Sequence, residues 1–508
     1  MNIILYPGAG WLAAPLAALL VLAPFEQAHA AASRKVRPAA VAGSFYPADP
    51  RALSAMIDAL LAQVSEPLIP DPILAAVAPH AGYPYSGPVA AYTYAALRGR
   101  RYKRVVVIAP SHYVAFDFTS IYDGDAYLTP LGSVPVDTAF ARELAKMSPT
   151  MRLSGQGHDV TRQGGEHAIE VQLPFLQTVL GRFELVPVVM GDQSYESSRA
   201  LGVALAKLIG KENGTGDTLV LASSDLSHYH SYDDAVAMDH KTLSALEAWD
   251  YFSMSRNFQA RVWEACGGAP IVAAMIYAER RGADQARVLR YANSGDVTGD
   301  HSRVVGYSAD VFVKAPKAQI REKSFALSAE EKRELLALAR KSVETAVLSH
   351  AVYEPPAGSI PALHQERGAF VTLKENGALR GCIGYTSAAE PLYLTVRDTA
   401  TLAALRDPRF PPVTAAELPR LEYEISVLSP LRRVLDIGQI RVGEDGLLVK
   451  NGDREGLLLP QVPVEQKWDR QSFVEQTCVK AHLSPGCWKD EDTDIFRFTA
   501  VVFSDGRP

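Results

Sequence analysis

Three apolar stretches that each end in a histidine constrain the fold of this chain more than any other feature. They are Ile73–His80 (ILAAVAPH), Val105–His112 (VVVIAPSH) and Leu219–His230 (LVLASSDLSHYH). Short apolar runs of this kind are typical of strands buried in a parallel sheet. Functional side chains gather where such strands end at their carboxyl edge. Because all three runs end in polar side chains, they predict one shared site at one edge of a sheet.

Strand-like and helix-like stretches alternate through residues 36–314. Apolar residues recur at helical spacing in Arg51–Val64 and Ser197–Ile209, whereas Phe183–Met190 is an apolar run typical of a strand. The stretch Gly165–Leu180 is predicted to be an amphipathic helix. Alternation of this kind predicts an α/β domain with a mostly parallel sheet covered by helices.

A second domain is expected because 508 residues exceed the length of one average domain. The polar, aperiodic stretch 315–327 is predicted to be a linker. Ser328 is followed three residues later by Glu331, a capping-box pattern that opens a helix. Beyond this helix, strands and helices no longer alternate regularly. Residues 328–508 are therefore predicted to form a separate α+β domain.

Residues 1–35 precede both predicted domains. Trp11–Phe25 is an apolar stretch of signal-peptide length, and Ala28–Ala30 fits a small-x-small cleavage pattern. No Lys or Arg stands before the apolar stretch, which departs from an ordinary signal peptide. Export to the periplasm, a membrane anchor, and a misassigned start codon of a cytoplasmic protein stay open. The net charge of -6 gives no electrostatic reason to expect nucleic-acid binding.

Two histidines and a cysteine are the candidate metal ligands. Imidazole binds zinc, iron and copper, and thiolate is a soft ligand, so His80, His112 and Cys266 at one sheet edge would form a three-ligand site with open positions. The competing interpretations are histidines that cap loops and a cysteine that packs as a small hydrophobe. Asp225 and His228 are the candidate catalytic pair, with His228 as the acid–base group and Asp225 fixing its tautomer.

Three further side chains are candidates for the pocket wall. Tyr83 stands in a Gly- and Tyr-rich stretch, 82–87, that is predicted to be a loop. His167 and Glu170 lie three residues apart on one face of the predicted helix. A half-buried aromatic ring and a surface helix pair are the structural alternatives for these residues.

Six motifs of the first half resemble one known family in combination. They are VAGSFYP at 41–47, APHAGYPYSG at 78–87, APSH at 109–112, GEHAIEVQLPF at 165–175, SSDLSH at 223–228 and ACGG at 265–268. This set resembles the Memo family (mediator of cell motility), also called AmmeMemoRadiSam system protein B. The resemblance implies a fold similar to class III extradiol dioxygenases and a metal site at His80, His112 and Cys266, with Asp225 and His228 beside it. It also implies iron or copper in an oxygen- or redox-related role.

One difference from the dioxygenases limits what the resemblance implies. Those enzymes hold ferrous iron with two histidines and a carboxylate, whereas Cys266 stands in the place of the carboxylate here. Cleavage of catechol rings is therefore not implied, and zinc stays open as the metal.

The second half resembles another family. Its motifs are LRGCIG at 379–384, DPRFPP at 407–412, ELPRLEYEISVLSP at 417–430 and GLLLPQV at 456–462, which are similar to the AMMECR family, or AmmeMemoRadiSam system protein A. Arg380 and Cys382 are candidate pocket residues of this domain, with a tight turn as the structural alternative. Cys478, His482 and Cys487 offer three zinc-type ligand atoms, but at no standard spacing.

The sequence thus favours a metal-dependent, oxidoreductase-like enzyme that acts on an unknown small-molecule substrate. The name of the system implies a radical SAM protein as a separate partner, because this chain has no CxxxCxxC motif. Two other functions stay open. One is a non-catalytic protein that binds a small ligand or a peptide, and the other is a hydrolase with a zinc-activated water.

Overall fold

The fold is that of a computed structural model, which describes residues 35–65, 69–161, 164–211, 217–314, 326–355, 361–386 and 390–505. The signal-like segment and most of the predicted linker lie outside these ranges. Within them, no helix combines the length and the apolar character that crossing a membrane requires.

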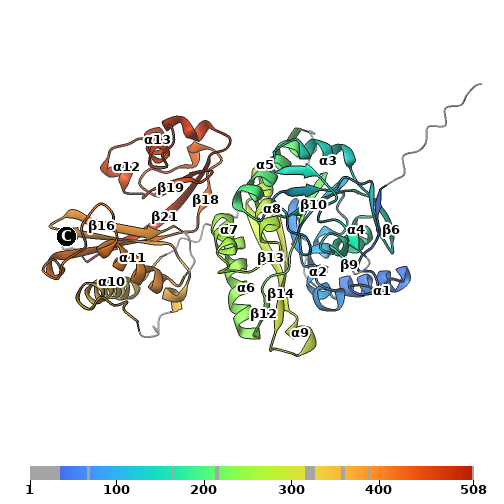
Figure 1. The fold of residues 1–508 in the computed structure, drawn as a ribbon, viewed down its shortest axis with the longest axis horizontal. Helices are drawn as coiled ribbons and strands as arrows, with labels where there is room; N and C mark the ends of the chain where they lie inside the picture. The colour runs from blue at the N-terminus through green and yellow to red at the C-terminus, as the bar shows by residue number, and fades with distance from the viewer. Residues whose placement is uncertain are drawn as a thin grey trace, which may run out of the picture. The chain divides into compact units, whose positions relative to one another are not determined.

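A nine-stranded sheet forms the centre of the first half (Figure 1). Its four middle strands run parallel to one another, in the order β2 (Ile73–Ala78), β11 (Thr218–Ser223), β3 (Arg104–Pro110) and β10 (Glu184–Met190). The prediction of a mostly parallel sheet is therefore confirmed for the centre of the sheet.

The borders of this sheet are mixed in direction. On one side β14 runs antiparallel to β2, to β12 and to β13, and on the other side β4 runs antiparallel to β10 but parallel to β7. The flanking strands are β12 (His228–His230), β13 (Gln285–Asn293), β14 (Val304–Val313), β4 (Thr119–Ile121) and β7 (Met151–Leu153). Small additional sheets are formed by β1 (Val36–Arg37), β5 (Ala126–Thr129), β6 (Gly132–Pro135), β8 (Val160–Thr161) and β9 (Gly164–Gly165).

Helices cover both faces of the central sheet, as the alternating pattern predicts. Successive residues of β3 enter different cores: Val106 and Ile108 pack on one side, Val105 and Val107 on the other. The first side is covered by α3 (Thr138–Ala145), α5 (Tyr195–Lys211), α6 (Tyr232–Glu247), α7 (Tyr251–Gln259) and α8 (Gly268–Arg280). The second is covered by α1 (Pro50–Ala62), α2 (Tyr83–Leu97) and α4 (Leu173–Leu180), while α9 (Gly295–Thr298) connects β13 to β14.

Two local predictions were wrong. The stretch 82–87 is helical, because α2 begins at Tyr83 with Pro84 in its first turn, where a proline needs no amide hydrogen. The helix predicted over Gly165–Leu180 begins only at Leu173, after a single 3-10 turn. Glu166 accepts hydrogen bonds from backbone amides just after it, which competes with helix formation. His167 and Glu170 therefore do not share one face of a helix.

The second half is a seven-stranded antiparallel sheet with helices, in the strand order β16-β15-β17-β21-β19-β20 and with β18 beside β21. The strands are β15 (Ala369–Glu375), β16 (Ala378–Tyr385), β17 (Leu421–Leu428), β18 (Arg432–Arg433), β19 (Asp445–Asn451), β20 (Arg454–Leu458) and β21 (Asp494–Ser504). The helices are α10 (Ala329–Ser349), α11 (Leu392–Leu405), α12 (Val462–Glu465) and α13 (Arg470–Lys480). The predicted capping box at Ser328 and Glu331 is present.

Cys478 and Cys487 form a disulfide. Bonded sulfur atoms cannot act as thiolate ligands, so the zinc site considered for these residues is excluded. The two cysteines lie nine residues apart and tie α13 to the turn that follows it.

Candidate functional site

Three neighbouring strands bring the candidate residues together. β11 lies between β2 and β3 and runs parallel to both. His80 follows β2, His112 follows β3, and Asp225 follows β11, all at the carboxyl edge of the sheet. The shared site that the strand pattern predicts is therefore formed by adjacent strand ends.

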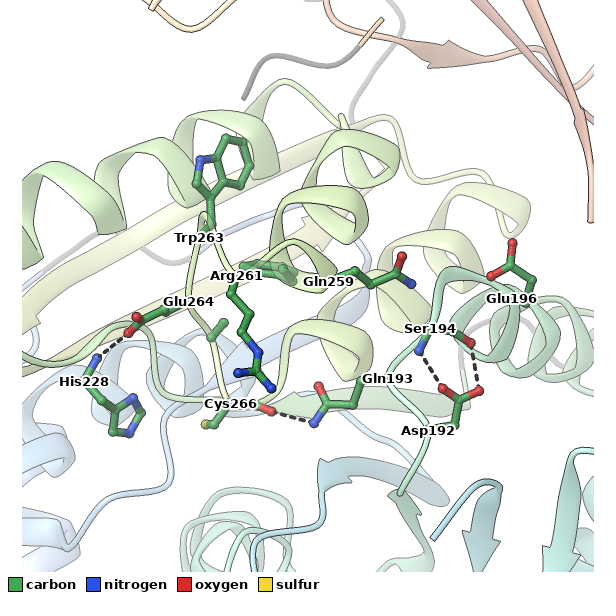
Figure 2. Close-up of a pocket in the computed structure, with 12 residues that line it drawn as sticks. Asp192, Gln193, Ser194, Glu196, His228, Gln259, Arg261, Trp263, Glu264 and Cys266 are labelled. Carbon is green, nitrogen blue, oxygen red and sulfur yellow. Dashed lines mark hydrogen bonds between the residues drawn. The ribbon is translucent and has the colours of Figure 1, made fainter. Parts of the chain in front are cut away.

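Cys266 lies just before α8, and its side chain reaches the same edge of the sheet. Its Sγ atom lies 3.0 Å from Nε2 of His80 and accepts a hydrogen bond from the amide of Asp225 at 3.2 Å. A Cβ atom at Gly267 would lie 2.3 Å from the carbonyl oxygen of Ser223, so only glycine permits this close approach. Cys266 and His228 also line a cavity of about 840 Å³ (Figure 2).

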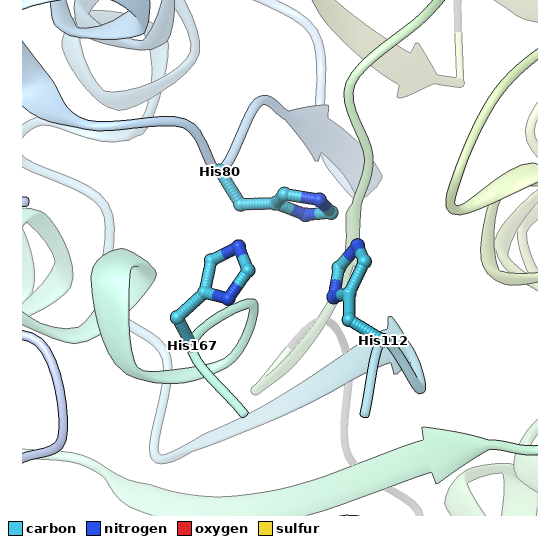
Figure 3. Close-up of side chains that lie close together, drawn as sticks. All are labelled: His80, His112 and His167. Carbon is cyan, nitrogen blue, oxygen red and sulfur yellow. The ribbon is translucent and has the colours of Figure 1, made fainter. Parts of the chain in front are cut away.

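His167 joins His80 and His112 at the centre of the site. The three imidazole rings face one another, and one ligand atom of each lies within 4.8 Å of those of the other two (Figure 3). The group could hold a metal ion. The sequence placed His167 in the pocket wall, and its position in the loop before α4 puts it among the potential ligands instead.

Hydrogen bonds determine which nitrogen of each ring is free. The hydroxyl of Ser223 donates to the carbonyl of Ala168 (2.6 Å) and accepts from Nε2 of Gln172 (2.7 Å). Its remaining lone pair accepts from Nδ1 of His80 at 2.9 Å, so Nε2 of His80 carries a lone pair.

A carboxylate orients the second imidazole. Oε1 of Glu166 accepts from Nδ1 of His112 at 3.0 Å, which leaves Nε2 of His112 as the free lone pair. This carboxylate–histidine arrangement is typical of metal-binding histidines. The Nδ1 atom of His167 is buried and has no hydrogen-bond partner among the described residues, which fits a nitrogen that is held for a ligand.

Burial favours the uncharged forms of His80, His167 and Cys266 in the metal-free chain. For His112 burial has the same effect, but the hydrogen bond and charge of Glu166 outweigh it and raise the pKa of His112. Burial lowers the pKa of His80 well below its usual value, with His112 adding to the effect, and it lowers the pKa of His167 to about 3. Burial and the nearby Asp225 raise the pKa of the Cys266 thiol. Although burial opposes it, the hydrogen bonds with His112 lower the pKa of Glu166 to about 2.

The predicted catalytic pair is arranged differently from the expectation. Nδ1 of His228 donates to the carbonyl of Leu226 at 2.8 Å, so this carbonyl, and not Asp225, fixes the tautomer of His228. Oδ1 of Asp225 accepts from the backbone amide of His80 at 2.8 Å and thereby holds the end of β2 against the end of β11. Burial raises the pKa of Asp225.

Tyr83 and Glu170, two of the predicted pocket residues, are buried. The hydroxyl of Tyr83 donates to the carbonyl of Val171 at 2.7 Å, and the ring is buried. The fully buried carboxylate of Glu170 accepts from Arg37 at 2.7 Å and from the hydroxyl of Tyr46 at 2.6 Å. These contacts brace the N-terminal segment of the domain against the loop that carries His167.

The candidates of the second half form a local network of their own. Arg380 pairs with Glu417 at 2.7 Å. The amide of Cys382 donates to Asp407 at 2.8 Å, and its Sγ atom accepts from the hydroxyl of Thr372 at 3.2 Å.

The sequence did not single out Glu166 as a site residue. Its carboxylate accepts four hydrogen bonds, from Nδ1 and the backbone amide of His112 and from the amides of His167 and Ala168. The adjacent Glu-His pair in the sequence was the available signal. Because the stretch was predicted to be a helix, this pair was not recognised as part of the site.

Comparison with known proteins places both halves. Residues 37–311 match the model of the Memo-like proteins, and residues 336–503 match that of AMMECR1. The MEMO1 family protein MK0963 of Methanopyrus kandleri is 38% identical over 285 residues, which cover 54% of this chain and 98% of that protein. Protein TK0174 of Thermococcus kodakarensis is 46% identical over 184 residues, which cover 34% of this chain and 90% of that protein.

Part of the chain is also similar to solved structures, of which the following is an example. The crystal structure of the uncharacterized protein PH0010 from Pyrococcus horikoshii is 41% identical and covers 36% of this chain and 96% of its own, with a TM-score of 0.35. The two family models and the relative from Methanopyrus kandleri show that this chain belongs to the Memo family through residues 37–311 and is a fusion with an AMMECR1 domain at residues 336–503.

Proposed function

We propose that the first half is a metal-dependent, oxidoreductase-like enzyme that binds iron or copper and acts on a small-molecule substrate. His80, His112 and Cys266 are the proposed ligands, and His167 stands beside them as a further donor. The observation that carries the proposal is the meeting of three imidazoles at one sheet edge, with ligand atoms within 4.8 Å of one another. The fold similarity to class III extradiol dioxygenases that the Memo resemblance implies is the reason for proposing an oxygen-related reaction.

The donor set fits a transition metal. The three histidines form one group that could hold an ion, and Sγ of Cys266, which is not part of that group, lies 3.0 Å from Nε2 of His80. Nitrogen and sulfur donors of this kind suit iron, copper and zinc. The thiol of Cys266 is protonated in the metal-free chain, so binding through sulfur would release a proton. Bound there, the metal would supply Lewis acidity or electron transfer.

The chain itself would manage protons and position. Because Nδ1 of His228 donates to the Leu226 carbonyl, its Nε2 is free to take or give a proton within the cavity that Cys266 also lines. Asp225 would act as a positioning group, since it holds the backbone of His80.

Metal analysis of protein purified without oxygen tests the proposal. Wild type is compared with the triple variant His80→Ala/His112→Ala/Cys266→Ala, and with His240→Ala as a control for an exposed histidine outside the site. We expect iron or copper near one equivalent in wild type and in the control, and its loss in the triple variant. The single variants His167→Ala and Cys266→Ser then show which of the two donors completes the site.

Other outcomes favour other functions. Zinc that is lost in the same way would favour a hydrolase with a zinc-activated water. A chain without metal in all variants would contradict the proposed site and favour a protein that binds a small ligand or peptide without converting it. For the second half we propose a supporting role in the same reaction, with the radical SAM protein of the system as a separate partner.

A further inference from the structure

Four charged side chains border the cavity beside Cys266, and three of them already have a partner. Asp192 accepts from the amide and the hydroxyl of Ser194, at 3.0 and 2.8 Å. Glu264 accepts from Nε2 of His230 at 3.0 Å, and Glu196 pairs with Lys450 of the second half at 3.2 Å. The three carboxylates of the cavity wall are thus already engaged.

Arg261 is the fourth charged group of the wall, and its guanidinium has no hydrogen bond or ion pair within the described part of the chain. The side chain extends from the segment after α7 toward Cys266 and Gln193 (Figure 2). The amide nitrogen of Gln193 already donates to the carbonyl of Cys266 at 3.1 Å. An unpaired, solvent-exposed positive charge therefore borders the cavity beside the proposed metal ligand.

The backbone turn that ends α7 fixes the position from which the side chain of Arg261 extends. Its amide donates to the carbonyl of Phe258 at 3.1 Å, and the amide of Val262 donates to that of Asn257 at 2.9 Å, which together end α7 in a Schellman motif. Arg261 occupies the left-handed position of this motif, with a φ of 57°, where glycine is the usual residue. The turn forms without any contribution from the guanidinium, so the charge is free for a ligand.

We propose that Arg261 binds the carboxylate of a small organic acid, whose other end reaches the group formed by His80 and Cys266. The inference depends on the proposed function for the end of the ligand that reacts, whereas the binding of the carboxylate by Arg261 does not depend on it. A planar guanidinium binds a carboxylate through two parallel hydrogen bonds. The ring of Phe258 lines the same cavity and offers an apolar surface to the body of the acid. The substrate class is therefore a small carboxylic acid with an apolar or aromatic body.

Calorimetric titration of the full-length protein with benzoate, and with its neutral isostere benzamide, tests this assignment. We expect benzoate to bind more tightly than benzamide, and Arg261→Gln to weaken benzoate on the order of ten- to a hundredfold without changing benzamide. Arg261→Gly removes the same charge at a position that glycine prefers, so an equal loss in this variant cannot come from misfolding. Arg101→Gln, at an exposed arginine outside the cavity, is the control and should bind as wild type does.

Three results would overturn the proposal. They are unchanged benzoate affinity in both Arg261 variants, no benzoate binding to wild type, and tighter binding of phenyl phosphate than of benzoate, which would assign the cavity to phosphate esters. Metal content measured on the same samples separates this test from that of the proposed function. The Arg261 variants should keep their metal. If the wild type contains no metal but still binds benzoate through Arg261, only the proposed function is contradicted.

Discussion

Replacing Glu166 by glutamine removes the carboxylate that holds two of the potential ligands while keeping the size of the side chain. In the wild type, Oε1 accepts from Nδ1 of His112 and from the amides of His167 and Ala168, and Oε2 accepts from the amide of His112 at 2.7 Å. Glutamine has one acceptor oxygen. Placed at the position of Oε1, it keeps three hydrogen bonds, but its amide group then faces the N–H of His112, which loses its partner.

The size of the effect follows from these contacts. A buried donor without a partner costs about 1–3 kcal/mol, so the free energy of unfolding of the metal-free chain should fall by that amount. His112 would also lose the negative charge that orients its ring and raises its basicity. Loss of such a partner typically lowers metal affinity by about 10- to 100-fold. We therefore expect Glu166→Gln to be folded, modestly less stable and clearly weaker in metal binding.

Two measurements check this prediction: urea unfolding of the metal-free protein, and competition for the metal with a chelator. Glu143→Gln on α3 is the control, because this exposed carboxylate pairs with Lys146 on the surface and its loss should cost less than about 1 kcal/mol. A folded Glu166→Gln protein that binds metal within about twofold of wild type would refute the idea that this carboxylate orients the ligands.

Three further predictions concern stability. Burial lowers the pKa of His158 to about 3, and its Nδ1 lies 2.6 Å from the hydroxyl of Tyr127. Below about pH 6.5 the unfolded chain takes up a proton at this residue that the folded chain does not, which lowers the free energy of unfolding by about 2 kcal/mol at pH 5. In urea titrations, the stability difference between pH 7.5 and pH 5 should therefore be smaller by about 2 kcal/mol in His158→Gln than in wild type. Reduction of the disulfide between Cys478 and Cys487 should destabilise the second half by about 2–3 kcal/mol, and thermal unfolding of a double serine variant should not respond to a reductant. Asp494→Asn should cost about 3–5 kcal/mol in urea unfolding, because the buried carboxylate lies among three arginine side chains that would keep their charge.

The sequence was sufficient to predict the strands that position the site. Apolar runs bounded by polar residues identify β2, β3 and β11, and the parallel arrangement of neighbouring strands brings His80 and His112 together. The capping box at Ser328 and Glu331 was equally predictable, since it depends on two residues three positions apart. A short sequence pattern predicts structure reliably when that structure depends on residues close together in the sequence.

The loop that carries His167 could not be predicted in this way. Its apolar residues have helical spacing, but the carboxylate of Glu166 binds the amides of the two residues after it, which a helix would use. The carboxylate of Glu170 binds the amides of Ala40 and Val41, which belong to a distant segment of the chain. The guanidinium of Arg37, which also donates to Glu170, comes from 133 residues away in the sequence. The tautomer of His228 depends in the same way on a backbone carbonyl, that of Leu226, which no residue pattern encodes.

Helix α7 links the candidate site to the second half of the chain. Phe252 on this helix contacts Phe496 of β21, with ring centroids 5.2 Å apart. The segment after the helix carries Arg261 and ends at Cys266, and between them Nε1 of Trp263 donates to Glu366 of the second half at 3.1 Å. The metal donors and the cavity wall belong to the first half, and these contacts join the second half to the segment that carries both the proposed anchor and a proposed ligand. The described contacts thus connect the AMMECR1 domain to the candidate site through α7 and the segment that follows it.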